Sequence, residues 1–187
     1  MKSVAFLTIT LLFILAAGQS QGQTQPTTKE TKKEIRQEKK AKKLTLKKLE
    51  GTTVNPKAKK NFEAKYGKTS KARFARRNYF DVATYMKDDI EINVYFDNNG
   101  DFVGSTNVAK FSDMPLKGQQ NLKADYRDYT IRRVVFFKDN PKNDCDMMLY
   151  NIQFDDEDTY FVEMSKGNKT IVVQVEPNGK VYYFTSI

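Results

Sequence analysis

The stretch from residue 90 to residue 108 constrains the fold more than any other part of this chain. Its first half alternates apolar and polar residues strictly, which is the period of a β-strand with one buried face. The alternating apolar positions are Ile90, Ile92, Val94 and Phe96. Asn99-Gly100 follows, and this dipeptide favours the tight turn of a β-hairpin into a second strand over 102–108. Antiparallel β-structure is therefore the expected frame of the fold.

Two short amphipathic helices are also predicted, each opened by a proline. Asn55-Pro56 is a typical helix start, because Asn caps the first turn and Pro suits the first helical position. Gly67 is a typical stop. A second helix begins at Pro115, where the pattern Ala58, Phe62, Tyr66 recurs as Gly118, Leu122, Tyr126.

A similar recurrence links the strands. The apolar positions and turn of the first hairpin recur in Ile171, Val173, Val175, Asn178 and Gly179, with an insertion near 139–146. Further strands are expected at 82–86, 130–137, 148–154, 161–164 and 181–184. The predicted fold is an α+β domain over 55–187, made of two tandem helix-plus-antiparallel-meander repeats (about 55–110 and 111–187). They would form one curved sheet with the helices on one face.

Several motifs of this domain resemble those of the beta-lactamase-inhibitor-like, PepSY-like domains of exported bacterial proteins. They are Phe62-x-x-x-Tyr66, the run Asn93 to Val103, Met114-Pro115 and the run Val175 to Val181. The resemblance implies a two-repeat α+β domain without catalytic residues, and a concave sheet face that grips a protein partner. Members often carry an aromatic residue where this chain has Arg73-Phe74-Ala75-Arg76.

The N-terminus has the composition of a cleavable signal peptide, predicted over residues 1–22. Lys2 precedes an apolar run from Val4 to Ala17, which is short for a membrane span, and small residues follow. An uncleaved anchor is the alternative. The expected location is the periplasm or the cell surface, which also suits a domain whose single cysteine, Cys145, leaves no intramolecular disulfide.

The net charge of +9 is concentrated outside the predicted domain. Residues 19–60 carry +9, whereas residues 61–187 carry −1. We expect residues 23–54 to be a basic tether, disordered or transiently helical, that either acts as a solvated spacer or contacts an acidic envelope surface. The near-neutral domain argues against a nucleic-acid partner, although Arg73, Arg76, Arg77, Arg132 and Arg133 would make a phosphate-binding surface if their strands were adjacent.

Catalytic, cofactor and metal sites are not expected. The sequence contains no histidine, the commonest general base near neutral pH. Acidic neighbours should raise the pKa of the Cys145 thiol, which favours an incidental residue over a reactive or dimer-forming one. Asp97 and Asp101 flank the Asn-Gly turn without completing a calcium loop. The acidic run 155–158 fits a solvated turn better than a weak cation site.

One face of the predicted sheet is the candidate protein-binding face. By alternation its residues point away from the helices, and they are Tyr95, Phe161, Val172, Tyr182 and Phe184. An uncovered aromatic face is a candidate interface, and the alternative is that a loop, the tether or the other repeat covers it.

The leading functional hypothesis is an exported, non-enzymatic module, expected to be monomeric, that binds a protein or peptide, with inhibition of that partner as one form. The alternative is a structural envelope protein anchored by its lysine-rich tether.

Overall fold

A computed structural model describes residues 46–68 and 71–187, and the predicted signal peptide and most of the tether lie outside these residues. The helices are α2 (Pro56–Tyr66) and α3 (Leu116–Asp125), with the 3-10 turn η1 (Phe111–Asp113) before α3. The strands are β1 (Arg73–Arg76), β2 (Asp81–Lys87), β3 (Ile90–Phe96), β4 (Phe102–Ala109), β5 (Thr130–Asp139), β6 (Met147–Leu149), β7 (Ile152–Phe154), β8 (Thr159–Lys166), β9 (Lys169–Val175) and β10 (Val181–Ser186).

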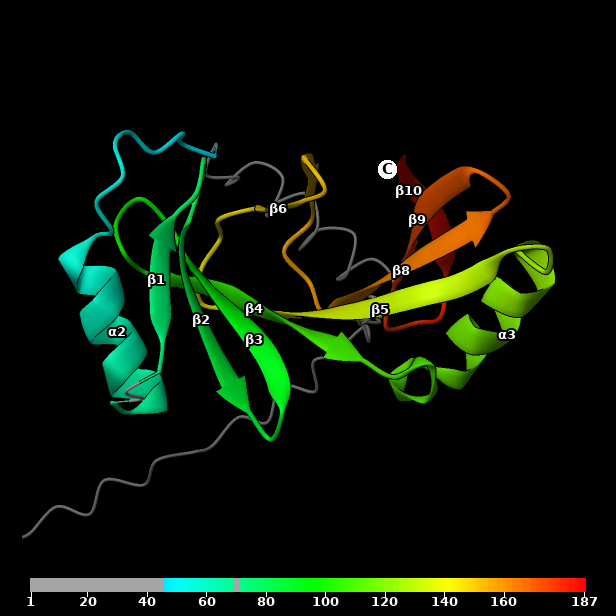
Figure 1. The fold of residues 1–187 in the computed structure, drawn as a ribbon, viewed down its shortest axis with the longest axis horizontal. Coiled ribbons are helices and arrows are strands. Elements are labelled where there is room, and N and C mark those ends of the chain that lie inside the picture. The colour runs from blue at the N-terminus through cyan, green and yellow to red at the C-terminus, as the bar shows by residue number, and fades with distance from the viewer. Residues whose placement is uncertain (1–45, 69–70) are drawn as a thin grey trace, which may run out of the picture. The chain divides into compact units, whose positions relative to one another are not determined.

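Eight of these strands form one sheet in the order β1-β2-β3-β4-β5-β8-β9-β10, and every neighbouring pair is antiparallel. Figure 1 shows the sheet running between α2, beside β1 and β2, and α3 at the other end. The strands β6 and β7 pair only with each other.

The predicted architecture of two tandem helix-plus-meander repeats is wrong. The described part of the chain is mostly β, a single eight-stranded antiparallel sheet with two short helices, so α+β fits it only loosely. Residues Gly104 to Ala109 of β4 pair with β5, so the sheet continues without a break from the first predicted repeat into the second. The β6–β7 hairpin adds a second layer within the second predicted repeat, and the segment from β1 to β4 has no such hairpin. The similarity between the two segments of the chain predicted two helices and two turns, but these segments are not two separate structural repeats.

The helix α2 forms where the capping signals predict it. The side chain of Asn55 accepts a hydrogen bond from the backbone N–H of Lys57 at 2.9 Å, and Pro56 occupies the first turn. Gly67 ends the helix with a φ of 77°, and its N–H donates to the Glu63 carbonyl. The buried face of α2 consists of Ala58 and Phe62, which pack on β2 and β3.

Strand register places both helices over the same face of the sheet. Ala83 of β2 pairs with Val94, Val94 pairs with Ser105, and Ser105 pairs with Lys138 of β5. These four paired residues therefore lie on the same side of the sheet. Lys138 and Val134 lie on the same side of β5 because side chains alternate along a strand. Val134 pairs with Val162 of β8, and Val162 pairs with Val173 of β9, so these residues share that side as well. Ala83 and Val94 belong to the cluster under α2, whereas Val134, Val162 and Val173 belong to the cluster under α3.

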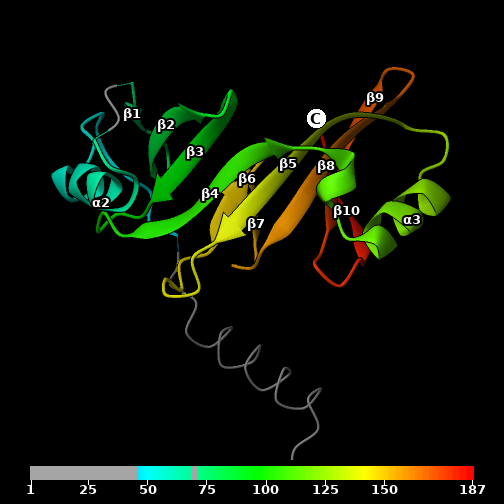
Figure 2. The same ribbon diagram turned by 90° about the horizontal axis from the view of Figure 1, so that it is seen from below.

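The opposite face is covered by the β6–β7 hairpin, which we call the cover hairpin (residues 147–154). Figure 2 shows it beside β4 and β5, between the two helical ends of the sheet. Met147 and Phe154 bury their side chains in a cluster with Phe137 and Phe161. The single strand predicted over 148–154 is therefore wrong, because Tyr150 and Asn151 turn the chain back with φ values of 52° and 61°.

Candidate binding site

Most of the sheet face that the sequence suggested as a protein-binding face is buried. Phe161 and Val172 have 0% exposure, and Tyr95 and Phe184 are partly buried against the same cluster. Tyr182 is 43% exposed on the edge strand β10. While the cover hairpin is in place, Phe161 and Val172 cannot contact a partner, so only the outer parts of this face remain available.

Aromatic contacts hold the cover hairpin on the face. The Phe154 ring centroid lies 4.8 Å from that of Phe161 and 5.2 Å from that of Phe137, both in edge-on geometry. Phe184 contacts Phe154 and Phe161 from β10. A loop insertion thus covers this face, which is one of the alternatives that the sequence left open.

The cover hairpin leaves a hollow of about 450 Å³ between its tip and the corner that joins β1 to β2. This volume lies in the usual range of ligand pockets. The sheet contributes Val82 and Tyr95 to its lining. The corner contributes Arg76, Arg77, Asn78, Tyr79 and Phe80, and the hairpin contributes Met148, Leu149, Tyr150 and Asn151.

Backbone hydrogen bonds fix the corner side of the hollow. The Arg77 N–H donates to the Phe80 carbonyl at 2.8 Å, which closes the turn between β1 and β2. The Leu49 N–H donates to the Asn78 carbonyl at 2.7 Å, so the described end of the tether runs along this corner. The corner is therefore a built structure, tied to segments on both sides.

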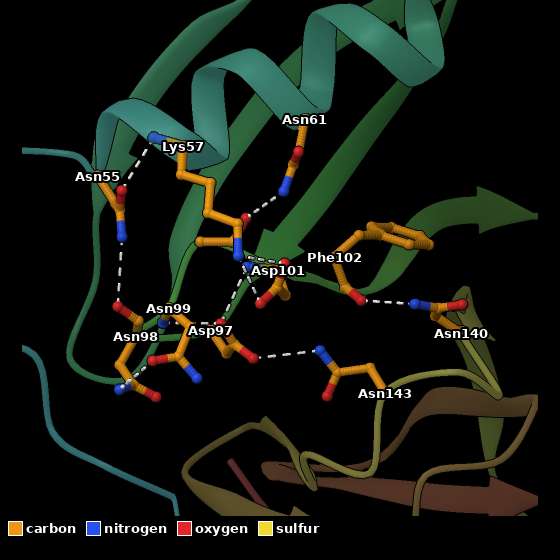
Figure 3. Close-up of polar contacts among 11 residues, drawn as sticks. Asn55, Lys57, Asn61, Asp97, Asn98, Asn99, Asp101, Phe102, Asn140 and Asn143 are labelled. Carbon is orange, nitrogen blue, oxygen red and sulfur yellow. Dashed lines mark hydrogen bonds and ion pairs between the residues drawn. The ribbon is translucent and has the colours of Figure 1, made fainter.

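The base of the insertion is tied to the first hairpin. Asn140 donates to the carbonyl of Phe102, and Asn143 donates to Asp97 at 3.2 Å (Figure 3). Asp97 also accepts hydrogen bonds from the N–H groups of Asn99 and Asp101. These bonds show a capped hairpin turn, and no group of described residues is arranged to hold a metal ion.

Two tyrosines that line the hollow have their hydroxyl groups in polar contact with residues outside its lining. The Tyr150 hydroxyl donates to the Glu163 carboxylate at 2.7 Å, and the Arg133 guanidinium lies 3.8 Å from the same carboxylate. The Tyr95 hydroxyl lies 3.0 Å from Thr106 Oγ1. Burial raises the pKa of both tyrosines above its ordinary value, so both hydroxyl groups keep their protons to a higher pH than an exposed tyrosine does.

The charges around the hollow leave one arginine without a partner among the described residues. Arg76 is paired with the buried Asp81 at 2.8 Å. The exposed Arg77 has no side-chain hydrogen bond or ion pair within residues 46–68 and 71–187, and no acidic residue lines the hollow. The hollow is therefore apolar on its inner side and cationic at its rim.

The five arginines do not form the phosphate-binding surface considered above. Arg132 and Arg133 lie on β5, and the strands β2, β3 and β4 separate them from β1. Arg132 donates to Ser165 Oγ at 2.7 Å, and Arg133 lies near Glu163. The condition that their strands be adjacent is not met.

Cys145 lies in the core cluster under the insertion and is 7% exposed. Burial, with smaller contributions from Asp97, Asp146 and Asp156, raises the pKa of its thiol to about 11. The direction predicted from the acidic neighbours is confirmed, although burial is the larger cause. A buried, protonated thiol is a poor nucleophile.

Sequence reasoning missed Tyr79, Leu149 and Tyr150 among the residues that build the hollow, and it named Arg77 only as one of five arginines of a conditional phosphate-binding surface. Periodicity detects a strand of about five residues or more, but β6 and β7 have three each. The available signal was Asn151, because Asn tolerates the left-handed conformation that a tight hairpin turn requires.

Within the described segments, no helix has the length and apolar character needed to cross a membrane. No protein-family model matches the sequence, and no curated protein matches it.

Solved structures do match. A DUF2874 family protein from Bacteroides uniformis has a TM-score of 0.57 at 14% identity, covering 69% of this chain and 86% of that chain. A BLIP-like protein from Bacteroides fragilis has a TM-score of 0.55 at 12% identity, covering 72% and 87%. A protein from Bacteroides eggerthii, provisionally named as periplasmic, has a TM-score of 0.56 at 11% identity, covering 71% and 91%.

These likenesses concern the fold alone, because the identities are low. They confirm the beta-lactamase-inhibitor-like part of the predicted resemblance at the level of the fold, and the PepSY-like part stays a prediction. The chain therefore shares a BLIP-like fold with proteins of Bacteroides, one of them provisionally named as periplasmic.

Proposed function

We propose that this protein is an exported, non-catalytic binding module that holds a peptide segment of a protein partner in the hollow beside the cover hairpin. The observation that carries the proposal is the hollow itself, about 450 Å³ in volume, on the sheet face opposite both helices. An unfilled space between two well-anchored walls can admit side chains of a partner without unfolding the domain.

The lining of the hollow suits a peptide. Tyr79, Tyr95 and Tyr150 offer aromatic contact area with hydroxyl groups, a combination enriched at protein interfaces. Leu149 and Met148 add an apolar wall. The volume matches one or two side chains of a partner rather than a whole domain, so we expect the partner to present an extended segment.

The non-catalytic part of the proposal is supported by the chemistry of the side chains. The sequence has no histidine, and its only thiol is buried with a raised pKa. We also propose that the protein is located in the periplasm and that its domain is PepSY-like. The signal-like N-terminus and the provisionally periplasmic neighbour support the location. The BLIP-like neighbour makes inhibition of the partner one form that the binding could take.

Selection from a library of random peptides displayed on phage tests the proposal. Peptides are selected on the purified protein, and their binding to the Leu149→Asp variant is then measured. We expect a loss of binding of about 30-fold or more, because an aspartate would place a charge in the apolar wall. Leu116→Asp is the matched control, since Leu116 is 69% exposed on α3, away from the hollow.

A second variant guards against misfolding of Leu149→Asp. Asn78 is exposed at the corner, so Asn78→Trp should narrow the hollow while leaving the core intact. Thermal unfolding followed by circular dichroism establishes that each variant is folded. Selected peptides that bind both hollow variants as tightly as the unchanged protein would show that the hollow is not the binding site.

A further inference from the structure

We infer that the hollow recognises a carboxylate next to an apolar side chain, so that its partner presents an acidic, partly apolar peptide segment. This inference rests on the proposed function and names the chemistry of the ligand. It starts from the separation of two properties within the hollow, an apolar inner wall and a cationic rim.

The rim is cationic because one positive charge lacks an acidic partner among residues 46–68 and 71–187. Arg76 is neutralised by Asp81, and Arg133 is partly neutralised by Glu163. Arg77 has neither kind of contact with any described residue, and no Asp or Glu lines the hollow. A guanidinium at the rim of an apolar space favours an anion, and its planar donors match a carboxylate in particular.

Arg77 also acts on the floor of the hollow. Burial is the largest effect on the pKa of Tyr95 and raises it, the positive charges of Arg77 and Arg133 lower it, and the negative charge of Glu91 has a smaller raising effect. Both arginines are therefore close enough to Tyr95 to influence it. A carboxylate beside Tyr95 would therefore lie close to two guanidinium groups. The Glu163 carboxylate, already held by Tyr150 and Arg133, shows that this face accommodates such a group.

The same charge argues against the protein's own tether as the occupant. The predicted tether is rich in lysine, and its positive charges would repel the guanidinium of Arg77. A nucleic acid would satisfy the charge but not the apolar wall of Met148 and Leu149, whose surface calls for aliphatic or aromatic side chains.

Three short peptides separate the possible sources of the carboxylate. Acetyl-alanyl-leucyl-phenylalanine carries a C-terminal carboxylate. Acetyl-glutamyl-leucyl-phenylalanine amide carries a side-chain carboxylate, and acetyl-glutaminyl-leucyl-phenylalanine amide is neutral. Binding of each to the purified protein is measured by NMR titration at millimolar concentrations. We expect one or both carboxylate peptides to bind about tenfold more tightly than the neutral peptide.

Arg77→Gln should reduce this preference to near unity, whereas Arg127→Gln should leave it unchanged. Arg127 is the matched control because it is also exposed but follows α3 at the other end of the sheet. Equal binding of the three peptides, binding of none of them, or a preference that survives Arg77→Gln would overturn the inference. So would tighter, Arg77-dependent binding of a single-stranded oligonucleotide at the same salt concentration.

The two proposals fail in different ways. Selected peptides that depend on Leu149 but show no preference for carboxylates would leave the hollow as the binding site and remove only its specificity. A library that yields no Leu149-dependent peptide would remove both.

Discussion

The two faces of the central sheet are covered in different ways. On one face, each helix is fixed to a turn of the sheet by a hydrogen bond, from Asn61 to the Gly100 carbonyl at 2.8 Å and from Asn121 to the Gly179 carbonyl at 2.9 Å. On the other face, the cover hairpin pairs with no strand of the main sheet and is held at its tip by Tyr150.

This difference shows that local sequence signals predict the helices on one face but not the cover hairpin on the other. Caps and prolines start the helices, and each of these signals lies within a few residues of the helix that it starts. The cover hairpin depends instead on ring contacts between Phe154 and residues of β5 and β8. Four experiments probe this contrast.

The largest expected effect comes from removing one large ring from each face. Phe62→Ala and Phe154→Ala should each lower the free energy of unfolding by about 3–5 kcal/mol, because both rings are buried. Urea unfolding measures this loss. If the cover hairpin were only loosely attached, Phe154→Ala would cost far less than Phe62→Ala, and the hairpin would count as a mobile layer.

The next effect concerns the turns that the helices contact. Gly100 and Gly179 have φ values of 79° and 82°, and a Cβ on either would lie 2.9 Å or less from atoms of the adjoining helix. Alanine at either position should therefore cost about 2–3 kcal/mol. Gly167→Ala is the control, since Gly167 has a φ of 57° but open space around it, and it should cost about 1 kcal/mol. Equal losses at all three glycines would contradict the close helix contact.

A pH effect should report on the core beneath the insertion. The folded state holds the Cys145 pKa at about 11, above its ordinary value of 9.0, so the folded protein binds the thiol proton more tightly than the unfolded chain. This contribution to stability is complete below pH 9 and is lost as the pH rises to 11. The loss should be about 1–2 kcal/mol by proton linkage. Urea unfolding at several pH values should show a shallower decline for Cys145→Ala, and an unchanged slope would place the thiol in contact with solvent.

The smallest effect is expected at the tip of the cover hairpin. Tyr150→Phe removes the hydroxyl that donates to Glu163, which should lower stability by about 1 kcal/mol. Amide hydrogen exchange of residues 148–152 should become faster while exchange in the helices stays the same. Uniformly faster exchange would mean that the tip is coupled to the whole fold.

The sequence predicted the parts of this molecule that depend on local patterns. The alternation before Phe96, the Asn99-Gly100 turn and the Asn55-Pro56 helix start all appear where they were expected. The repeat architecture was wrong because similar local patterns do not determine where one unit of a continuous sheet ends. The order of the strands depends on contacts between residues far apart in the chain.

The candidate site was only partly predictable for the same reason. Alternation grouped Phe161 and Val172 on the face away from the helices, but it could not show that the cover hairpin would bury them. That layer is made of two strands of three residues each, joined at Tyr150 and Asn151. Arg77 gains its significance only from the fold, which pairs Arg76 with Asp81 and leaves its neighbour at the rim.

The separate pairing of β6 and β7 has a consequence for how such a protein can diversify. Residues 148–151 line the hollow without contributing a rung to the eight-stranded ladder. Replacing them changes the shape and polarity presented to a ligand while the scaffold keeps its backbone pairing. New binding specificities could therefore arise through a few substitutions in this short hairpin, without any change in the pairing of the main sheet.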